Sequence, residues 1–147
     1  MKPLRRRPRG GRACAGYPRL LALAHPVYVS GAHPERTEFT GHEDQRGVCR
    51  DCAHLAVALC RCVNIPARYC TGYLGDIQVP PVPGPMDFCA WFEVYLDGGW
   101  RTCDARHNAL RVGHRLQCWG RDAAGVAITT MFGWATLTRF EVVAEEA

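Results

Sequence analysis

The sequence predicts an α+β domain in which one buried helix packs against a mainly antiparallel sheet. Residues 51–62 are apolar on nearly every side, and a helix that is apolar all round belongs inside a domain. Residues 67–74, 89–96 and 99–104 follow as strand-like segments. Asp97-Gly98, a strong two-residue hairpin signal, joins the last two. One helix followed by four or five such strands is an α+β arrangement.

The composition is that of a soluble globular chain large enough for one domain. The 147 residues are 48% hydrophobic and 22% charged, and no apolar run approaches the ~20 residues of a membrane span. Residues 1–20 hold seven basic groups and no acid, so the rest of the +4 chain carries a net charge of −3. We therefore divide the chain into a basic, poorly ordered segment (residues 1–46) and a core domain (residues 47–147). No aromatic residue interleaves with the arginines before Tyr17, so nucleic acid is not an expected partner.

Nine cysteines raise the question of disulfides or zinc. Their odd number, their clustered spacing and the lack of a secretory signal argue against a disulfide scaffold. Cys60, Cys62, Cys70 and Cys103 fall inside predicted helix or strand, where a free cysteine often serves as a small core residue. We therefore expect a cytoplasmic protein with reduced thiols.

Cys49 lies where a short loop enters the predicted helix. The unpaired N–H groups and the positive end of the helix dipole favour an anion at that position. A thiol placed there has a lowered pKa and is more often in its nucleophilic thiolate form. Asn64, which tolerates the left-handed conformation, and Pro66 mark the end of the helix.

The hairpin predicts a register. With a two-residue turn, Leu96 faces Gly99 and Trp91 faces Asp104, and side chains alternate between the two faces of the sheet. Cys89 therefore shares one face with Trp91 and Asp104, as a diagonal neighbour of the carboxylate.

The remaining segments give weaker signals. Residues 20–46 are expected to be mostly loop, and the proline-rich residues 75–87 to form a long surface loop. Residues 105–125 are predicted to be loop-rich, whereas residues 126–131 and 136–143 resemble two further strands.

Several blocks of sequence occur in a defined order along the chain. They are Gly47-Val48-Cys49-Arg50-Asp51, Ile65-Pro66-Ala67-Arg68-Tyr69, Ala90-Trp91-Phe92-Glu93-Val94-Tyr95 and Asp104-Ala105-Arg106-His107-Asn108. Together they resemble the transglutaminase-like superfamily, and most closely its bacterial members described as cysteine proteases. The resemblance implies a papain-like fold with a Cys-His-Asp triad on a helix and an antiparallel sheet. It also implies a protein or peptide substrate and neither a metal nor an organic cofactor.

Position by position, the resemblance implies that Cys49 is the nucleophile and that Asp104 orients the imidazole. It places the triad histidine immediately before Ala90-Trp91, where this chain has Cys89. Imidazole takes a proton from the nucleophile and returns it to the leaving amine, because its pKa is ~6.5. A thiol with a pKa of ~8.5 becomes an anion when it loses its proton, which would repel a Cys49 thiolate. We therefore expect acyl transfer through a Cys49 thioester to be impaired.

Other residues have less definite roles. His54 lies five positions along the helix from Cys49 and points elsewhere. His107 is a candidate replacement base, although a structural or surface role is the simpler interpretation. Tyr73 and Trp91 are candidates for a substrate groove or for core packing.

Three alternatives remain open. Cys49 and Cys52 form a CxxC at a helix start, the placement used in thiol–disulfide exchange, and a Cys49–Cys89 disulfide would be a second redox pair. Cys60 and Cys62 would complete four thiols for zinc, although a helix spreads them over more than two turns. A non-catalytic binding module is the third alternative.

Overall fold

A computed structural model of the chain describes residues 27–28, 37–80, 88–107, 111–127, 132–136, 138–139 and 142–143. The elements, in chain order, are β1 (Val27–Tyr28), α2 (Glu38–Asp44), β2 (Arg46–Gly47), α3 (Cys49–Cys62), β3 (Ala67–Leu74), β4 (Phe88–Leu96), β5 (Gly99–Cys103), β6 (His114–Gly120) and the 3-10 turn η1 (Ala124–Val126). The α+β prediction is confirmed. Within the described ranges, no helix is long and apolar enough to cross a membrane.

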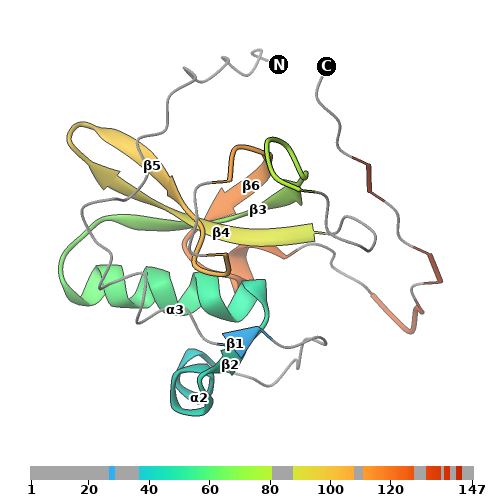
Figure 1. Cartoon of the computed structure of the whole chain (residues 1–147). Helices are drawn as coiled ribbons and strands as arrows, with labels where there is room; N and C mark the ends of the chain where they lie inside the picture. Colours follow the sequence, from blue (N-terminus) through green and yellow to red (C-terminus); the bar gives the residue numbers. More distant parts are fainter. Residues whose placement is uncertain are drawn as a thin grey trace.

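The sheet has four strands in the order β5-β4-β3-β6, and each neighbouring pair is antiparallel. In Figure 1, α3 lies along one face of this sheet, and its first turn is at the same end as the start of β4. The short strands β1 and β2 pair in parallel beside α2, at that same end of the molecule. The architecture therefore brings the start of the buried helix next to the first residues of a central strand.

The start of α3 is fixed by the loop that precedes it. The backbone N–H of Val48 donates to Asp51 Oδ2 at 3.1 Å, and the side chain of Arg50 pairs with Asp51 Oδ1 at 3.0 Å. An acidic residue in the first turn satisfies a free backbone donor and opposes the positive end of the helix dipole. At the other end, Asn64 has a φ of 58°, the left-handed helix stop that the sequence predicts.

The hairpin between β4 and β5 has the predicted register. Leu96 pairs with Gly99 and Val94 pairs with Arg101, while Asp97 and Gly98 have φ values of 50° and 75°. Two positive φ values match the two-residue turn expected for Asp-Gly. Asp104 follows the last residue of β5, so the predicted face shared by Cys89, Trp91 and Asp104 is retained.

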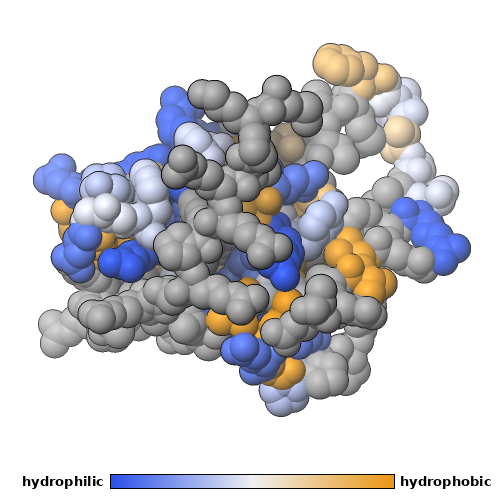
Figure 2. Space-filling model, turned by 90° about the horizontal axis from the view of Figure 1, so that it is seen from above, coloured by the Kyte–Doolittle hydropathy of each residue, from blue (hydrophilic) through white to orange (hydrophobic). Residues whose placement is uncertain are grey.

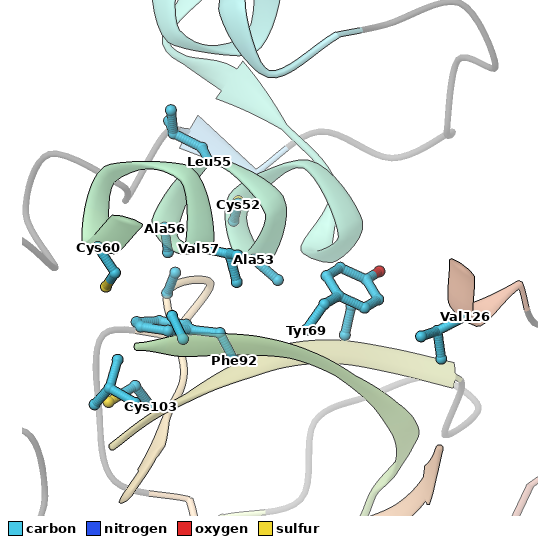
Figure 3. Packing of buried hydrophobic residues seen from close by; sticks show 14 residues of the cluster. Cys52, Ala53, Leu55, Ala56, Val57, Cys60, Tyr69, Phe92, Cys103 and Val126 are labelled. Atoms are coloured by element: carbon cyan, nitrogen blue, oxygen red, sulfur yellow. The ribbon is translucent and has the colours of Figure 1, made fainter. Parts of the chain in front are cut away.

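One face of the sheet forms the core with α3. Figure 3 shows Cys52, Ala53, Ala56 and Val57 of the helix directed at the strands, where Tyr69 and Phe92 meet them. Buried apolar area of this kind is the main source of stability, at roughly 25 cal/mol per Å² removed from water. Positions of β4 alternate between the two faces, so Cys89 and Trp91 belong to the other face.

That other face carries a buried ion pair under aromatic rings. Arg68 Nε donates to Glu93 Oε2 at 2.7 Å, and the Arg68 guanidinium lies 4.2 Å from the Trp100 ring and 4.6 Å from the Trp119 ring. Both tryptophans stay partly exposed. Figure 2 views the molecule from this side, where hydrophobic patches lie between hydrophilic ones.

Two regular elements were not predicted. Residues 20–46 were expected to be mostly loop, yet Glu38–Asp44 form α2, which begins where the Thr40 N–H donates to Thr37 Oγ1 at 3.2 Å. Residues 105–125 were expected to be loop-rich, yet His114–Gly120 form β6. That strand is held by pairing with β3 across an irregularity at Thr71 and Gly72. A strand stabilised by its neighbour rather than by β-branched residues leaves little signal in its own sequence.

Other expectations are corrected or lie beyond the description. Val126 belongs to η1 rather than to a strand, and residues 128–131 lie outside the described residues. The strand predicted at residues 136–143 is not seen in the described residues of that range, where residue 142 forms a single bridge; residues 137, 140 and 141 lie outside the description. The same holds for the basic tail, so the expected boundary at residue 46 stays a prediction. Cys60 and Cys70 are buried and free as expected, but Cys62 is exposed and Cys103, although in the core, is disulfide-bonded.

Candidate active site

The candidate site lies where the first residue of α3 meets the start of β4. Cys49 opens the helix and is half-buried, and Cys89, the second residue of β4, is 2% exposed. The Cys89 thiol has the largest single influence on the pKa of Cys49, so the two side chains are neighbours. The structure therefore brings together the two cysteines that the sequence singled out.

Cys49 is held as a thiolate near neutral pH. The hydrogen bond from Cys89 lowers the pKa of Cys49 to about 6, against the opposing effect of burial. A backbone hydrogen bond from Ala90, the positive charge of Arg106 and a backbone hydrogen bond from Arg50 lower this pKa further. Hydrogen bonds to the charged form favour it, and so does the first turn of a helix. The prediction of a lowered thiol pKa at this position therefore agrees with the geometry.

The expected repulsion between two thiolates is one of the causes that raise the pKa of Cys89. The hydrogen bond to Cys49, together with burial, raises the pKa of Cys89, so this thiol stays protonated and acts as a donor. Cys89 Sγ also lies 3.6 Å from the carbonyl oxygen of Ala90, a second acceptor for the same proton. A neutral thiol stabilises the neighbouring thiolate, but it has no free electron pair basic enough to take up a proton. Cys89 supports the nucleophile without serving as its base.

Asp104 is buried and ionised, and two histidines surround it. The backbone N–H of His107 donates to Oδ1 at 3.0 Å, and His107 Nδ1 lies 2.7 Å from Oδ2. His114 Nε2 is 3.4 Å from Oδ2, which is long for a hydrogen bond, and it has no better partner among the described residues. Burial would raise the pKa of Asp104, but the contacts from His107 and His114 outweigh it and hold that pKa below its usual range.

The three residues that the sequence assigned to a triad influence one another electrostatically. Cys89 lowers the pKa of Cys49, and the charge of Asp104 contributes to the raised pKa of Cys89, since the register places both on one face. The imidazoles of the site, however, contact Asp104. His54 instead meets the ring of Tyr69 edge-on, at 6.2 Å between centroids.

The other cysteines do not form a second site with Cys49. Burial raises the pKa of Cys52 to about 12, so the second thiol of the CxxC is a poor nucleophile. Cys60 lies in the core and Cys62 is exposed. Across the part of the chain that the structure describes, no group of three or more histidines, cysteines or acids is arranged to hold a metal ion.

The two aromatic candidates differ. Trp91 is fully buried and packs on the His114 ring at 4.6 Å between centroids, so it supports the imidazole that lies near Asp104. Tyr73 is half-buried against Phe88, at 4.8 Å between ring centroids. Core packing is the role that the contacts of Trp91 favour.

Two residues near the site, Arg106 and His114, were not assigned to it from the sequence, whereas His107 was considered there as a replacement base. His107 had a local signal, because an aspartate often accepts a hydrogen bond from a backbone N–H a few residues later. Arg106 and His114 had none. His114 reaches the site only through the pairing of β6 with β3, where it opposes Leu74.

Comparison with known proteins agrees with this geometry. The family model of the transglutaminase-like superfamily matches residues 24–105, more than half of the chain. An uncharacterized protein of Mycobacterium leprae (strain TN) is 31% identical over 104 residues, which are 68% of this chain and 37% of that protein. The crystal structure of a "putative cysteine protease" from Cytophaga hutchinsonii superimposes with a TM-score of 0.71 at 38% identity. The superimposed part makes up 84% of this chain and 43% of the chain of that protein.

The chain spans less than half the length of both of these proteins. The shared part contains the helix, the central strands and the residues Cys49, Cys89 and Asp104. This chain belongs to the transglutaminase-like superfamily.

Proposed function

We propose that the chain is a transglutaminase-like acyl-transfer domain whose activity on amide and peptide bonds is impaired at one position. Cys49 would attack the carbonyl carbon and form a thioester, with water or an amine as the second acceptor. The observation that supports the proposal is the placement of a buried thiol, Cys89, beside Cys49 at the position where the resemblance expects a histidine. The thiol of Cys49 has a lowered pKa, but the side chain beside it is a thiol and not an imidazole.

The missing step is the transfer of a proton to the leaving group. When the tetrahedral intermediate collapses, the departing amine needs a proton, which a triad histidine supplies as imidazolium. The raised pKa of Cys89 makes it a far weaker acid than an imidazolium. Positioned acid–base catalysis contributes about 10²–10⁴-fold to rate, so its loss is a severe impairment rather than a complete one.

The experiment that tests this function is Cys89→His. We expect the variant to release 4-nitroaniline from acyl 4-nitroanilides roughly 100-fold faster than the native chain, or more, in single-turnover assays near pH 7. Cys49→Ser in the same background is the control for release that does not use the nucleophile. Equal rates in the native chain and in Cys89→His would contradict an impairment at residue 89. His107→Gln in both would then show whether that imidazole already serves as the acid.

A non-catalytic binding module is the alternative that this assay also addresses. If neither chain forms an acyl-enzyme although Cys49 reacts with iodoacetamide, acyl transfer is excluded for the domain. A protein or peptide partner would then be sought by binding alone. We keep a protein or peptide as the expected partner and a cytoplasmic location as a proposal, against which the disulfide at Cys103 counts.

Thiol redox chemistry is a second candidate function, favoured by the same contact between Cys49 and Cys89. The Cys49 thiolate would attack a peroxide to give a sulfenic acid and release hydroxide. The Cys89 thiol would then displace water to form a disulfide, so two thiols supply the two electrons. Cys49 with Cys52 is the weaker pair because Cys89, and not Cys52, is the side chain that acts most strongly on the Cys49 sulfur.

The redox candidate predicts a specific product. Treatment with one equivalent of hydrogen peroxide should remove two free thiols and give a Cys49–Cys89 linked peptide in the mass spectrum. Cys89→Ser should stop at the sulfenic acid on Cys49. Two thiols that stay free under this treatment would end the redox interpretation.

A further inference from the structure

An imidazole performs two tasks in a cysteine acyl-transferase, and this site retains only one of them. The first task is to make the thiolate. Here it is met without histidine, by the Cys89 thiol, the Ala90 N–H and the charge of Arg106 around Cys49. The nucleophile therefore does not depend on a proton acceptor in the site.

The second task is to protonate the leaving group, and no imidazole of the described residues is seen to contact Cys49. The neighbour of Cys49 is the buried Cys89 thiol, whose raised pKa makes it a poor acid and whose hydrogen bond goes to the Ala90 carbonyl at 3.6 Å. The imidazole of His107 contacts Asp104, and so does that of His114 at longer range. Within the described residues, the acid–base groups are thus held on the carboxylate.

The chemical consequence depends on the leaving atom. An amine leaves an acyl carbon only after it gains a proton, because an amide anion is far too basic to be expelled. A thiolate needs no such help, because a thiol has a pKa of ~8.5 or lower. The site should therefore discriminate between substrates by the leaving group and not by the acyl group.

We propose that Cys49 takes acyl groups from thioesters and passes over amides, which makes an acyl thioester the substrate class of this chain. This inference rests on the proposed role of Cys49 as the nucleophile. The Cys49 sulfur attacks the thioester carbonyl, one C–S bond forms, and collapse of the intermediate breaks the other C–S bond. The leaving thiolate departs with the electron pair, and no proton moves. Return of the acyl group to a second thiolate is the same step in reverse.

The relative basicity of the two thiolates sets the direction of transfer. A thiolate displaces a more acidic thiol more readily than a more basic one. Since the pKa of Cys49 is lowered to about 6, an aryl thioester can load it. The loaded site would then donate to ordinary, more basic thiols.

The test compares two acetyl donors that differ only in the leaving atom, 4-nitrophenyl thioacetate and 4-nitroacetanilide. At pH 6.5 we expect a burst of one equivalent of 4-nitrothiophenolate from the native chain and an acetyl group on the Cys49 peptide. We expect no detectable 4-nitroaniline. Cys89→His should gain anilide release, so the ratio of the thioester rate to the anilide rate should fall roughly 100-fold or more.

The chain contains its own reference thiols. Cys62 and Cys118 are exposed and free, so a reagent that acylates any accessible thiol would label them as fast as Cys49. Equal labelling of the three would overturn the inference. Comparable release from the anilide and the thioester by the native chain would also overturn it and would reveal a hidden acid. If the thioester fails to acylate Cys49 although iodoacetamide does, the proposed function itself fails.

Discussion

The two anions of the site are stabilised in different ways. Cys49 is a thiolate at a helix start, with one thiol donor, backbone N–H groups and a nearby arginine. Asp104 is a carboxylate after the end of a strand, with one imidazole at 2.7 Å and another at 3.4 Å. Cys89 lies between them and is uncharged.

The difference separates charge stabilisation from proton transfer. In a working triad the imidazole lies between the nucleophile and the carboxylate, so it exchanges protons with one and is oriented by the other. Here both ends are prepared as anions, and the imidazoles of His107 and His114 contact the carboxylate. Under the proposed function, the site would keep its nucleophile without the acid–base residue. Substitutions around Cys49 should therefore change the pKa of its thiol, whereas substitutions of Asp104 should change the free energy of unfolding.

The largest effect is expected at the carboxylate. Asp104→Asn replaces the charge-assisted hydrogen bonds to His107 by neutral ones, at a cost of roughly 2 kcal/mol in the free energy of unfolding at pH 7. The pKa of Asp104 is lowered in the folded chain, so its stabilising contribution is complete above the unfolded value of ~3.9. That contribution is lost as the pH falls toward the folded value.

Urea denaturation of the native chain and of Asp104→Asn between pH 3 and pH 8 measures this contribution. The difference between the two chains in the free energy of unfolding should be constant above about pH 5 and should decrease below about pH 4. Asp97→Asn, which removes an exposed carboxylate at the hairpin turn, is the matched control and should show little difference. A difference for Asp104→Asn that does not depend on pH would mean that the cost is steric rather than electrostatic.

At the nucleophile, removing the thiol donor should raise the pKa of Cys49. Cys89→Ala deletes the largest stabilising influence, so the apparent pKa should rise from about 6 by a unit or more. The pH dependence of iodoacetamide labelling, located by mass spectrometry at the Cys49 peptide, measures it. At pH 6 the labelling rate should fall about fivefold or more, because the thiolate is the reactive form.

Cys89→Ser separates the hydrogen bond from the side-chain volume. A hydroxyl keeps the donor, so the pKa of Cys49 should stay near that of the native chain. If Ser and Ala raise this pKa equally, the donor is not what stabilises the thiolate, and the contrast between the two ends of the site disappears.

The local features of the site could be predicted from the sequence. The apolar helix, its stop at Asn64 and the hairpin register depend on residues close together in the chain, and all three are confirmed. The register alone placed Cys89 and Asp104 on one face. The position of Cys49 at the first helical residue followed from the loop before it.

The other features of the fold and the site depend on contacts between segments that are distant in the sequence. β6 is a strand because β3 pairs with it, and only that pairing carries His114 to Asp104. The protonation state of Cys89 depended on such a contact too. Two isolated thiols have similar pKa values, and the sequence places Cys49 at a helix start but does not show that Cys89 is buried beside it. That asymmetry makes one the anion and the other the donor.

The smallest effect is expected from the arginine near the nucleophile. Arg106 acts on Cys49 through its charge and ranks below the hydrogen bonds from Cys89 and Ala90. Arg106→Gln should therefore raise the apparent pKa of Cys49 by less than Cys89→Ala does, by roughly half a unit. The same labelling experiment measures it, with Arg115→Gln on the exposed part of β6 as the control.

Ionic strength provides a second criterion for this charge effect. Salt screens a charge interaction but leaves a short hydrogen bond nearly unchanged, since the Debye length falls from ≈10 Å at 0.1 M to ≈3 Å at 1 M. The difference between the native chain and Arg106→Gln should therefore shrink in 1 M NaCl, whereas that for Cys89→Ala should persist. If Arg106→Gln raises the pKa of Cys49 as much as Cys89→Ala, the thiolate is stabilised by charge. Cys89 would then be a spacer between the two anions rather than a donor to one of them.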